Sequence, residues 1–379
     1  MKIIYLDFAA TTPVDARVLE KMSACMTIDG IFANPASQHA YGNIAREYVE
    51  WARVQVADYL HATPEEIIWT SGATESNNLA LKGAAWLSQK RGKHLITMKT
   101  EHKSVLDSCQ HLEKEGFAVT YLQPDERGVL VIEELIKALR PDTILVSIMH
   151  VNNETGVVQP IAEIADILHK RGILFHVDAA QSIGKIPLNL DQLLIPLVSL
   201  SAHKVYGPKG IGALYVRKKP RTRVMPLIHG GGHEQGMRSG TLPTHQIVGM
   251  GEAYAIAAVE QEVESKRITH LRQQLLSQLE PLNHLITKNT PVGQAVPHII
   301  SLRIKNTIAK MMLEQLPELA LSTASACQGK GSDGSYVLRA MGLTDAEIQS
   351  AIRISLGRFT VEDDITRATH AFKKYLLPT

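Results

Sequence analysis

The sequence predicts an α/β protein in which a large domain with a mainly parallel sheet precedes a smaller α+β domain. The first observation is the alternation of short apolar runs with amphipathic stretches between residues 66 and 202, which is typical of parallel strands joined by helices. The second is a helical pattern over residues 247–279, long enough to bridge two domains. The chain length of 379 residues agrees with this division, because one hydrophobic core rarely serves so long a chain.

The elements follow in order along the chain. The first helix is predicted within TTPVDARVLEKM, with Thr12 as its cap, Pro13 at its first position and Asp15 in its first turn. Buried strands are predicted at residues 66–70, 94–99, 118–122, 143–151, 173–179 and 197–202, with helices at 73–90, 132–139 and 160–172. In the second domain, strands are predicted at 298–304 and 319–324, and residues 345–357 are predicted to form a helix that runs into a strand. We expect the large domain to comprise residues 15–260 and the small domain residues 1–14 together with 261–379.

Composition and charge narrow the class of protein. The formal net charge is +2 and charged residues make up 21%, so neither a nucleic-acid-binding nor a membrane-binding surface is expected. Cys25, Cys109 and Cys327 lie far apart, so no metal site is expected and a reducing compartment is favoured. The apolar run Ile3–Leu6 is too short for a signal peptide. We therefore expect a cytoplasmic protein.

Lys204 stands in LSAHKVYGPKG, directly after a histidine and at the end of an apolar run. A lysine at a strand end, taken alone, is most often a surface residue. A lysine that forms a Schiff base needs a partly desolvated setting that favours the neutral amine. An aldehyde cofactor such as pyridoxal phosphate (PLP) would also need a carboxylate at its pyridine nitrogen, a cradle for its phosphate and a group stacked on its ring.

Other residues could meet the demands of such a ring. Asp178 in LFHVDAAQS ends a buried strand, where a carboxylate needs a partner, although it could equally cap a following helix. His102 in TEHKSV could stack on the ring and shuttle protons, although a single histidine is more often structural. Asn153 and Gln181 could hydrogen-bond the cofactor or the substrate, and neither is diagnostic alone.

The segment SGATES, residues Ser71–Ser76, is the candidate phosphate cradle. Backbone N–H groups at a helix start, including that of Ala73, favour an anion, and the Thr74 hydroxyl adds a donor. The segment is not a Walker loop, and a simple helix cap would have the same pattern. Ser201 and His203, close to the candidate lysine, could complete the cradle.

Two further candidates concern the substrate. Cys327 lies in LSTASACQGKGSDGSY, a glycine-rich loop without a large apolar residue before Tyr336, which suits an exposed nucleophile. The other two cysteines fall in helical patterns and fit small buried apolar side chains. Arg353 and Arg358 in AIRISLGRF could each grip a carboxylate, although a surface ion pair is the commoner role. Arg353 is favoured because it lies farther inside the apolar pattern.

The motifs taken together resemble the PLP-dependent cysteine desulfurases of the IscS/NifS type, in the class V aminotransferase superfamily. The resembling segments are YLDFAATTPVD, SGATESNNLA, KTEHKSVLD, SIMHVNNETGVVQ, HVDAAQSIGK, SAHKVYGPKGIGALYVR, HGGGHEQGMRSGTLPTHQIVGMGEA and SLGRFT. They extend from about residue 4 to about residue 362. The resemblance implies a fold-type-I PLP-dependent transferase, usually a homodimer with active sites at the subunit interface.

The resemblance also assigns roles to residues. Lys204 would bind the cofactor covalently, Asp178 would pair with the pyridine nitrogen, and His102 would stack on the ring. The other implied cofactor contacts are Ala73, Thr74, Asn153, Gln181, Ser201 and His203, together with Thr241 from the other subunit. Arg353, with Asn153, would bind the substrate carboxylate.

The implied reaction converts L-cysteine into L-alanine and leaves the sulfur on Cys327 as a persulfide, with Lys204 and His102 as the other catalytic residues. The sulfur would pass to an acceptor protein, either an iron–sulfur scaffold or a thiolation enzyme. Two departures concern that acceptor. Ala324 stands where the family commonly has glycine, and the chain ends at Thr379 without the longer tail that housekeeping members often carry. A dedicated role in nucleic-acid thiolation is therefore an alternative.

Three other functions fit parts of the sequence. A selenocysteine lyase or a class V aminotransferase would use the same cofactor, although the Cys327 loop argues against a plain aminotransferase. A hydrolase is suggested by HGGGH, His229–His233, but no GxSxG nucleophile elbow accompanies it. A non-enzymatic iron–sulfur scaffold would need several thiolates within reach, which three scattered cysteines do not offer.

Overall fold

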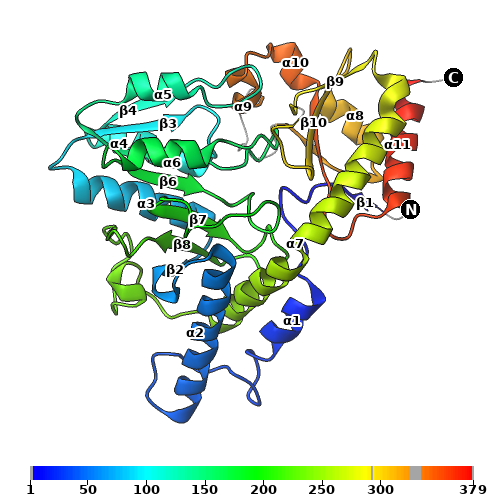
Figure 1. Ribbon diagram of the computed structural model, residues 1–379. Coiled ribbons are helices and arrows are strands. Elements are labelled where there is room, and N and C mark those ends of the chain that lie inside the picture. The colour runs from blue at the N-terminus through cyan, green and yellow to red at the C-terminus, as the bar shows by residue number, and fades with distance from the viewer. Residues whose placement is uncertain (1–2, 292, 325–333, 378–379) are drawn as a thin grey trace.

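The large sheet has seven strands in the order β2-β8-β7-β6-β5-β3-β4 (Figure 1). The computed structural model describes residues 3–291, 293–324 and 334–377. The strands are β2 (Ile67–Thr70), β3 (His94–Met98), β4 (Ala118–Leu122), β5 (Thr143–Ser147), β6 (Leu174–Asp178), β7 (Leu197–Ser201) and β8 (Gly212–Val216). Neighbours from β4 to β7 pair in parallel, whereas β8 is antiparallel to both β7 and β2. The predicted mainly parallel sheet is therefore confirmed.

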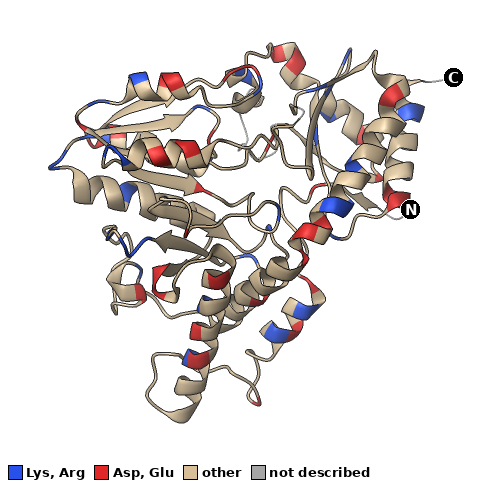
Figure 2. Ribbon diagram, in the orientation of Figure 1, with Lys and Arg blue, Asp and Glu red and all other residues tan. Residues whose placement is uncertain are grey.

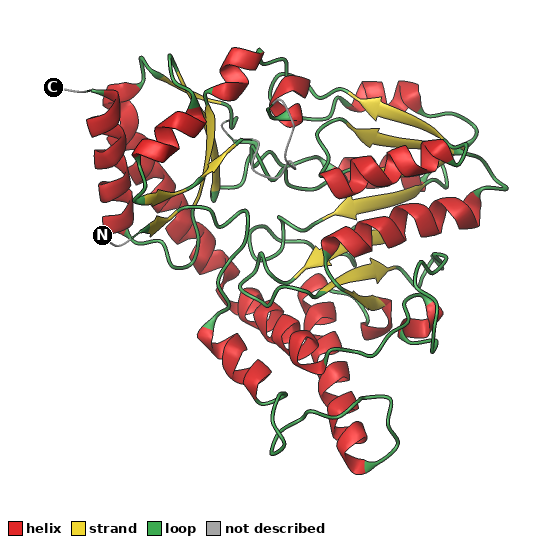
Figure 3. Cartoon of the chain, turned by 180° about the vertical axis from the view of Figure 1, so that it is seen from behind, coloured by secondary structure: helices red, strands yellow, loops and turns green. Residues whose placement is uncertain are grey.

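Helices cover both faces of this sheet (Figure 3). They are α2 (Ala40–Leu60), α3 (Ala73–Ser88), α4 (Lys103–Lys114), α5 (Ile132–Ala138) and α6 (Ile161–His169). Successive side chains of a strand point to opposite faces, so Leu95 and Leu197 share a core with α3 and α4. The next residue of each strand, Ile96 and Val198, belongs to the core shared with α2 and α6. Apolar residues on both sides of a strand thus explain why these runs are continuously hydrophobic.

A second, antiparallel sheet has the strand order β12-β13-β10-β9. Its strands are β9 (Ile286–Lys288), β10 (Ile299–Ile304), β12 (Ser322–Thr323) and β13 (Ala351–Ser355). The helices around it are α8 (Ala309–Gln315), α9 (Tyr336–Ala340), α10 (Asp345–Gln349) and α11 (Glu362–Leu376). The N-terminal β1 (Ile4–Tyr5) pairs in parallel with β11 (Leu319–Ala320), so the start of the chain joins this smaller α+β layer.

One long helix, α7 (Thr244–Leu279), contributes to a core of the large sheet and to the core of the small sheet. Its first part contributes Ile247 and Tyr254 to the core under the large sheet, and its second part contributes Leu271 and Leu275 to the core under the small sheet. Figure 1 shows this helix passing diagonally from one layer to the other. Short 3₁₀ helices lie at η1 (Pro64–Glu66), η2 (Glu234–Gly236) and η3 (Glu280–Leu282). The predicted division into residues 15–260 and the rest stays a prediction.

The predicted start of the first helix is wrong by several residues. Helix α1 (Ala16–Ser23) begins after Asp15, whose carboxylate accepts a hydrogen bond from the backbone of the first turn and is therefore the N-cap. Thr12 is instead bonded to the turn after β7, where its Oγ1 donates to the His203 carbonyl and accepts from the Tyr206 N–H. The Thr12 hydroxyl, which the sequence pattern predicts as a helix cap, therefore makes tertiary hydrogen bonds instead.

Other boundaries also differ from the sequence prediction. The strand predicted at 143–151 ends at Ser147, and the strand predicted at 319–324 is divided into β11 and β12. The helix-to-strand sequence at 345–357 is confirmed, whereas α2 was not predicted at all. Acidic and basic residues are interspersed over the ribbon (Figure 2). Among the described residues, no helix is both long enough and apolar enough to cross a bilayer.

Candidate active site

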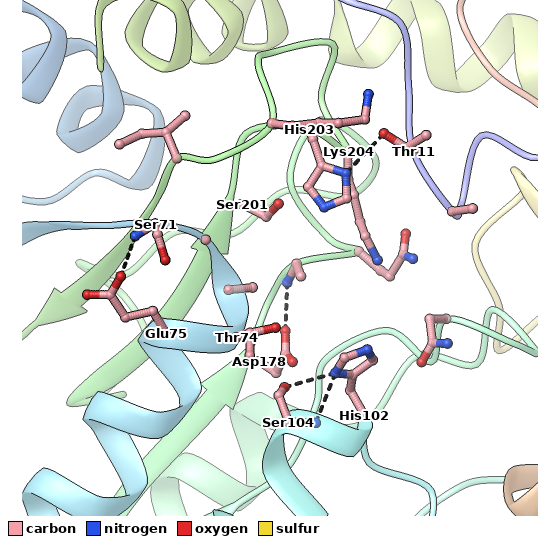
Figure 4. Close-up of a pocket in the computed structure, with 18 of the residues that line it drawn as sticks. Thr11, Ser71, Thr74, Glu75, His102, Ser104, Asp178, Ser201, His203 and Lys204 are labelled. Atoms are coloured by element: carbon pink, nitrogen blue, oxygen red, sulfur yellow. Dashed lines mark hydrogen bonds between the residues drawn. The ribbon is translucent and has the colours of Figure 1, made fainter. Parts of the chain in front are cut away.

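A cavity of about 530 Å³ lies beyond the carboxyl ends of the parallel strands (Figure 4). Asp178 is the last residue of β6 and Ser201 the last of β7, and the loops after β2, β3 and β5 add further side chains. Ligands of open α/β sheets are expected at this edge. The predicted site residues that line the cavity are Ala73, Thr74, His102, Asn153, Asp178, Gln181, Ser201, His203 and Lys204.

Lys204 lies on the turn after β7, and its half-buried side chain extends into the cavity (Figure 4). The turn is held by the N-terminal segment, since Thr12 Oγ1 lies 3.0 Å from the His203 carbonyl oxygen and 2.9 Å from the Tyr206 nitrogen. Tyr206 has a φ of 64°, a left-handed conformation that is uncommon for a residue other than glycine. The place of Lys204 is therefore fixed by tertiary contacts as well as by the strand that precedes it.

Asp178 is buried and its carboxylate has two N–H donors. The backbone N–H of Ala180 donates to Oδ1 at 2.9 Å, and Asn77 Nδ2 donates to Oδ2 at 2.7 Å. Residues 179–243, all of which the structure describes, contain no α-helix, so Asp178 does not cap one. The alternative role that the sequence left open is thereby excluded, and the carboxylate faces the cavity.

The first turn of α3 forms one side of the cavity. Its N-cap is Gly72, which has no side chain to satisfy the first N–H groups and whose φ of 152° favours glycine. A Cβ on Gly212 would lie 2.6 Å from the Gly72 Cα, so β8 can pass this close only as glycine. Ser201 Oγ is buried and has no hydrogen-bond partner among the described residues. Helix N–H groups and a hydroxyl that needs a partner together suit an anion.

Burial lowers the pKa of both histidines of the cavity. For His203, burial and then the nearby charges of Lys204 and Lys209 lower the pKa to about 4, so the ring is neutral at pH 7. Burial is also the largest cause of the lowered pKa of His102. His102 is the N-cap of α4, and its Nδ1 accepts from the Ser104 N–H at 3.2 Å and lies 2.8 Å from Ser104 Oγ. The proton of the neutral His102 ring is therefore on Nε2.

Asn153 and Gln181 line the cavity, whereas Arg353 does not. Arg353 lies on β13 with 2% of its surface exposed, and its Nη1 donates to the Asn153 carbonyl at 2.9 Å. Its Nη2 is 2.7 Å from an Asp7 carboxylate oxygen, and its buried Nε has no partner within the described part of the chain. Arg358, the alternative arginine, pairs with Asp15 at 2.7 Å. Arg353 therefore contacts Asn153, which lines the cavity, whereas Arg358 pairs with Asp15, the N-cap residue of α1.

Of the two remaining predicted residues, Thr241 and Cys327, the structure describes only Thr241. Thr241 is exposed and is not among the residues that line this cavity. Cys327 lies outside the described residues. Cys25 and Cys109 are buried, as predicted.

Sequence reasoning missed Asn77 and Ser104, which connect Asp178 with His102. The available signal was a polar residue on a helical face otherwise made of Ala80, Leu81 and Ala84, all buried. A polar residue at such a position needs a partner. Its partners come from β6 and α4, which no pattern within α3 can identify.

The family model described as aminotransferase class-V matches residues 4–368. The chain belongs to the class-V aminotransferase family. It is 56% identical over 363 residues to a protein named cysteine desulfurase IscS from Enterobacter sp. (strain 638), covering 96% of this chain and 90% of the relative. A solved NifS-like protein superimposes with a TM-score of 0.92 and 39% identity over 99% of both chains. The structure titled SspA in complex with cysteine has a TM-score of 0.83 and 40% identity, covering 94% of this chain and 99% of that one.

Class-V aminotransferases depend on PLP, and the cavity fits this cofactor. The uncapped start of α3 and the unpartnered Ser201 hydroxyl suit a phosphate, and Asp178 offers a carboxylate. Lys204 supplies an amine in the same cavity. The predicted family, fold class and cofactor are confirmed.

Proposed function

We propose that this protein is a PLP-dependent cysteine desulfurase that converts L-cysteine into L-alanine and transfers the sulfur to Cys327. One observation carries this proposal: Lys204, Asp178, His102 and the start of α3 line a single cavity in a chain with IscS- and NifS-like relatives. A structure of a relative solved with cysteine supports the choice of substrate. The hydrolase and iron–sulfur scaffold alternatives lack a comparable convergence of groups. A selenocysteine lyase or a class V aminotransferase would use the same cofactor groups, and Cys327 argues against the plain aminotransferase.

Each residue has a task in this proposal. PLP supplies an aldehyde for an amine and an electron-withdrawing ring that makes the Cα proton of the substrate acidic. Lys204 would hold the cofactor covalently and would be released when the substrate amine binds. Asp178, oriented by two N–H donors, would provide the negative charge for the pyridine nitrogen. His102 would contact the ring and has its Nε2 proton available for exchange, because Nδ1 is already bonded to Ser104.

The phosphate contacts in this proposal are the N–H groups of Ala73 and Thr74, the Thr74 and Ser201 hydroxyls and the neutral His203 ring. Gln181 would hydrogen-bond the cofactor through its Oε1, because its Nε2 already donates to the Ala9 carbonyl at 2.8 Å.

Arg353 and Asn153 bind the substrate carboxylate in this proposal. A guanidinium forms strong, directional bonds to a carboxylate, and Arg353 has a buried Nε without a partner in the described ranges. Asn153 Oδ1 is likewise buried without a partner there. Asp7 accepts a hydrogen bond from Nη2 of the same guanidinium at 2.7 Å.

Cys327 receives the sulfur. Its thiolate attacks the sulfur of the bound cysteine, the Cβ–S bond breaks, and its electron pair stays on the carbon, which takes up a proton to give alanine. A thiol plus cysteine thus becomes a persulfide plus alanine, and no external oxidant or reductant is consumed. The persulfide then passes its outer sulfur to an acceptor protein.

The oligomeric state, the domains and the sulfur acceptor are also part of the proposed function. We infer a homodimer in which the exposed Thr241 reaches the phosphate in the other subunit's cavity. The large domain would comprise residues 15–260 and bind PLP, and the small domain would carry the Cys327 loop. The acceptor would be an iron–sulfur scaffold or a thiolation enzyme, with the protein in the cytoplasm, binding neither nucleic acid nor membrane.

Mass spectrometry of the intact holoenzyme after brief exposure to L-cysteine tests the function. One added sulfur, located on Cys327 by peptide mapping and formed together with alanine, is the expected result. The Cys327→Ala variant should keep the cofactor colour but release no sulfide over many turnovers. Unchanged multiple-turnover sulfide release by that variant would remove Cys327 from the mechanism.

A further inference from the structure

We propose that Asn77 is a positioning residue that couples the Asp178 carboxylate to the His102 ring through Ser104. The two groups assigned to the cofactor ring would then be held as one unit by a residue of α3. This inference rests on the proposed function, because the ring contacts of Asp178 and His102 are part of that proposal.

The contacts of Asn77 define a continuous chain of hydrogen bonds. Its side chain is fully buried, and Nδ2 lies 2.7 Å from Asp178 Oδ2 and 2.8 Å from Ser104 Oγ. A carboxylate only accepts, so the amide nitrogen, with two hydrogens, must face it and can donate to both oxygens. Ser104 Oγ then donates its own hydrogen to His102 Nδ1 at 2.8 Å. Every bond of the chain therefore has one possible direction.

The carbonyl oxygen of the Asn77 amide shows which contacts determine the orientation of this side chain. Asn77 Oδ1 is buried and finds no hydrogen-bond partner in the described structure. An unsatisfied buried carbonyl destabilises the fold, and an apolar side chain of similar size would avoid this cost. A purely structural asparagine would be expected to have its acceptor satisfied. The two donated bonds are thus the reason for an amide at this position.

Loss of Asn77 would act on both ends of the chain. Asp178 would keep the Ala180 N–H at Oδ1 but would lose its donor at Oδ2, so the carboxylate could rotate. Ser104 would lose its incoming donor, and its hydroxyl could turn away from His102. The Ser104 backbone N–H would still contact the ring at 3.2 Å, so His102 would be displaced and not released.

The decisive variant is Asn77→Leu, which keeps the side-chain size and removes both donors. We expect the dissociation constant of PLP from the reconstituted apoprotein to rise about tenfold, the loss typical for a hydrogen bond to a charged group. We also expect a shift of the visible absorbance band of the bound cofactor. The ¹⁵N signal of His102 should move, and comparison with a His102→Gln spectrum identifies that signal.

Asn78→Leu is the matched control. Asn78 is the next residue of the same helix, and its Nδ2 donates to the Thr74 carbonyl at 2.9 Å and does not contact Asp178. PLP affinity, absorbance and the His102 signal should all stay as in the wild type. Equal changes in Asn77→Leu and Asn78→Leu would overturn the proposal, because a general effect on α3 would then explain both.

Ser104→Ala removes the hydroxyl that links Asn77 to His102 and keeps the backbone N–H contact to His102. Effects that pass through one network are not additive, so the double variant with Asn77→Leu should move the His102 signal no further than either single change. Simple addition would show two independent effects and overturn the coupling. If Asn77→Leu does not fold, Ser104→Ala alone should still move the His102 signal, and an unchanged signal would refute the proposal.

These readouts separate the inference from the function. Wild-type holoenzyme that forms no alanine from L-cysteine would refute the proposed function. Wild-type enzyme that forms alanine, beside an Asn77→Leu variant with unchanged PLP affinity and His102 signal, would refute only the role of Asn77.

Discussion

The two sides of the cavity are built in different ways. The side next to the large sheet connects Asp178 at the end of β6, Asn77 in α3, and Ser104 and His102 at the start of α4 by hydrogen bonds. The side next to the small sheet depends on Arg353, which donates hydrogen bonds to Asp7 and to the Asn153 carbonyl. These three residues come from distant segments of the chain.

This difference predicts which properties a substitution on each side of the cavity will change. On the first side the Asp178 carboxylate has neutral donors, and burial keeps His102 and His203 uncharged. The second side combines a guanidinium with two carboxylates, since the buried Glu154 accepts a hydrogen bond from Ser335 and feels the charge of Arg353. We expect changes on the first side to alter cofactor binding, and changes on the second to alter substrate binding and pH dependence.

The largest effect is expected at Lys204. Lys204→Ala removes the amine proposed to bond to the cofactor, and alanine formation should fall by about a thousandfold or more. Borohydride reduction followed by mass spectrometry should find the cofactor attached to the wild type and absent from the variant. Lys209→Ala, a lysine that also lines the cavity, is the control and should keep the attached cofactor. Attachment in the Lys204 variant would identify a different lysine.

Glu154 should give the second side a pH-dependent stability. Burial raises the pKa of Glu154 from 4.5 to about 7, against the opposing effects of Ser335 and Arg353. The folded state therefore holds this proton more tightly than the unfolded chain, so the free energy of unfolding falls as pH rises from about 4.5 to about 7. The loss is up to about 3 kcal/mol and is complete above the folded pKa.

Urea unfolding at pH 5 and pH 8 measures this contribution. Glu154→Gln keeps an acceptor for Ser335 but does not titrate, so its change in unfolding free energy between the two pH values should be smaller than in the wild type. Glu163→Gln, on the exposed side of α6, should behave like the wild type. Parallel pH profiles for all three proteins would show that Glu154 is charged throughout this range.

Arg353→Lys should separate the two arginines of the AIRISLGRF segment. A lysine keeps the charge but not the planar donors, so we expect KM for L-cysteine to rise roughly 30-fold with little change in PLP affinity. Arg358→Lys should lower stability instead, because Arg358 pairs with Asp15 and with Glu264 at 2.9 Å. Steady-state kinetics and thermal unfolding of both variants make the comparison. A larger KM effect at Arg358 would reverse the assignment.

The smallest effect is expected at Ser201. Ser201→Ala removes a hydroxyl proposed to bind the phosphate, and PLP affinity should fall roughly three- to tenfold. Ser182→Ala is a close control, because Ser182 Oγ is also buried without a partner in the described chain but lies outside the cavity lining. Titration of the two apoproteins with PLP checks this, and equal affinities would remove Ser201 from the cradle.

Much of this architecture was predictable from the chain. All strands of the large sheet except the edge strand β4 are buried almost throughout, so their apolar runs stand out, and turn residues mark their ends. Strand ends also explain why Asp178 and Lys204 could be recognised as candidates, since parallel strands bring their carboxyl ends to one edge. Arg353 could be chosen over Arg358 from its place within an apolar run.

Other features had no local signal. Thr12 has the pattern of a helix cap, yet its hydroxyl is bonded to the turn that carries Lys204. Asn77 has the spacing of a core residue, and its role depends on partners from β6 and α4. Helix α2 has a weak apolar pattern and is fixed mainly by packing against α7.

The sequence by itself determined most of the alternation of strands and helices between residues 66 and 202 and the residues with the right chemistry, because periodicity and residue type are local properties. Only the tertiary structure decided which donors meet which acceptors, how deeply each titratable group is buried, and hence that His102 and His203 are neutral while Glu154 has a raised pKa. Hydrogen-bond direction and desolvation depend on neighbours that lie far away in the chain, and folding alone brings them together.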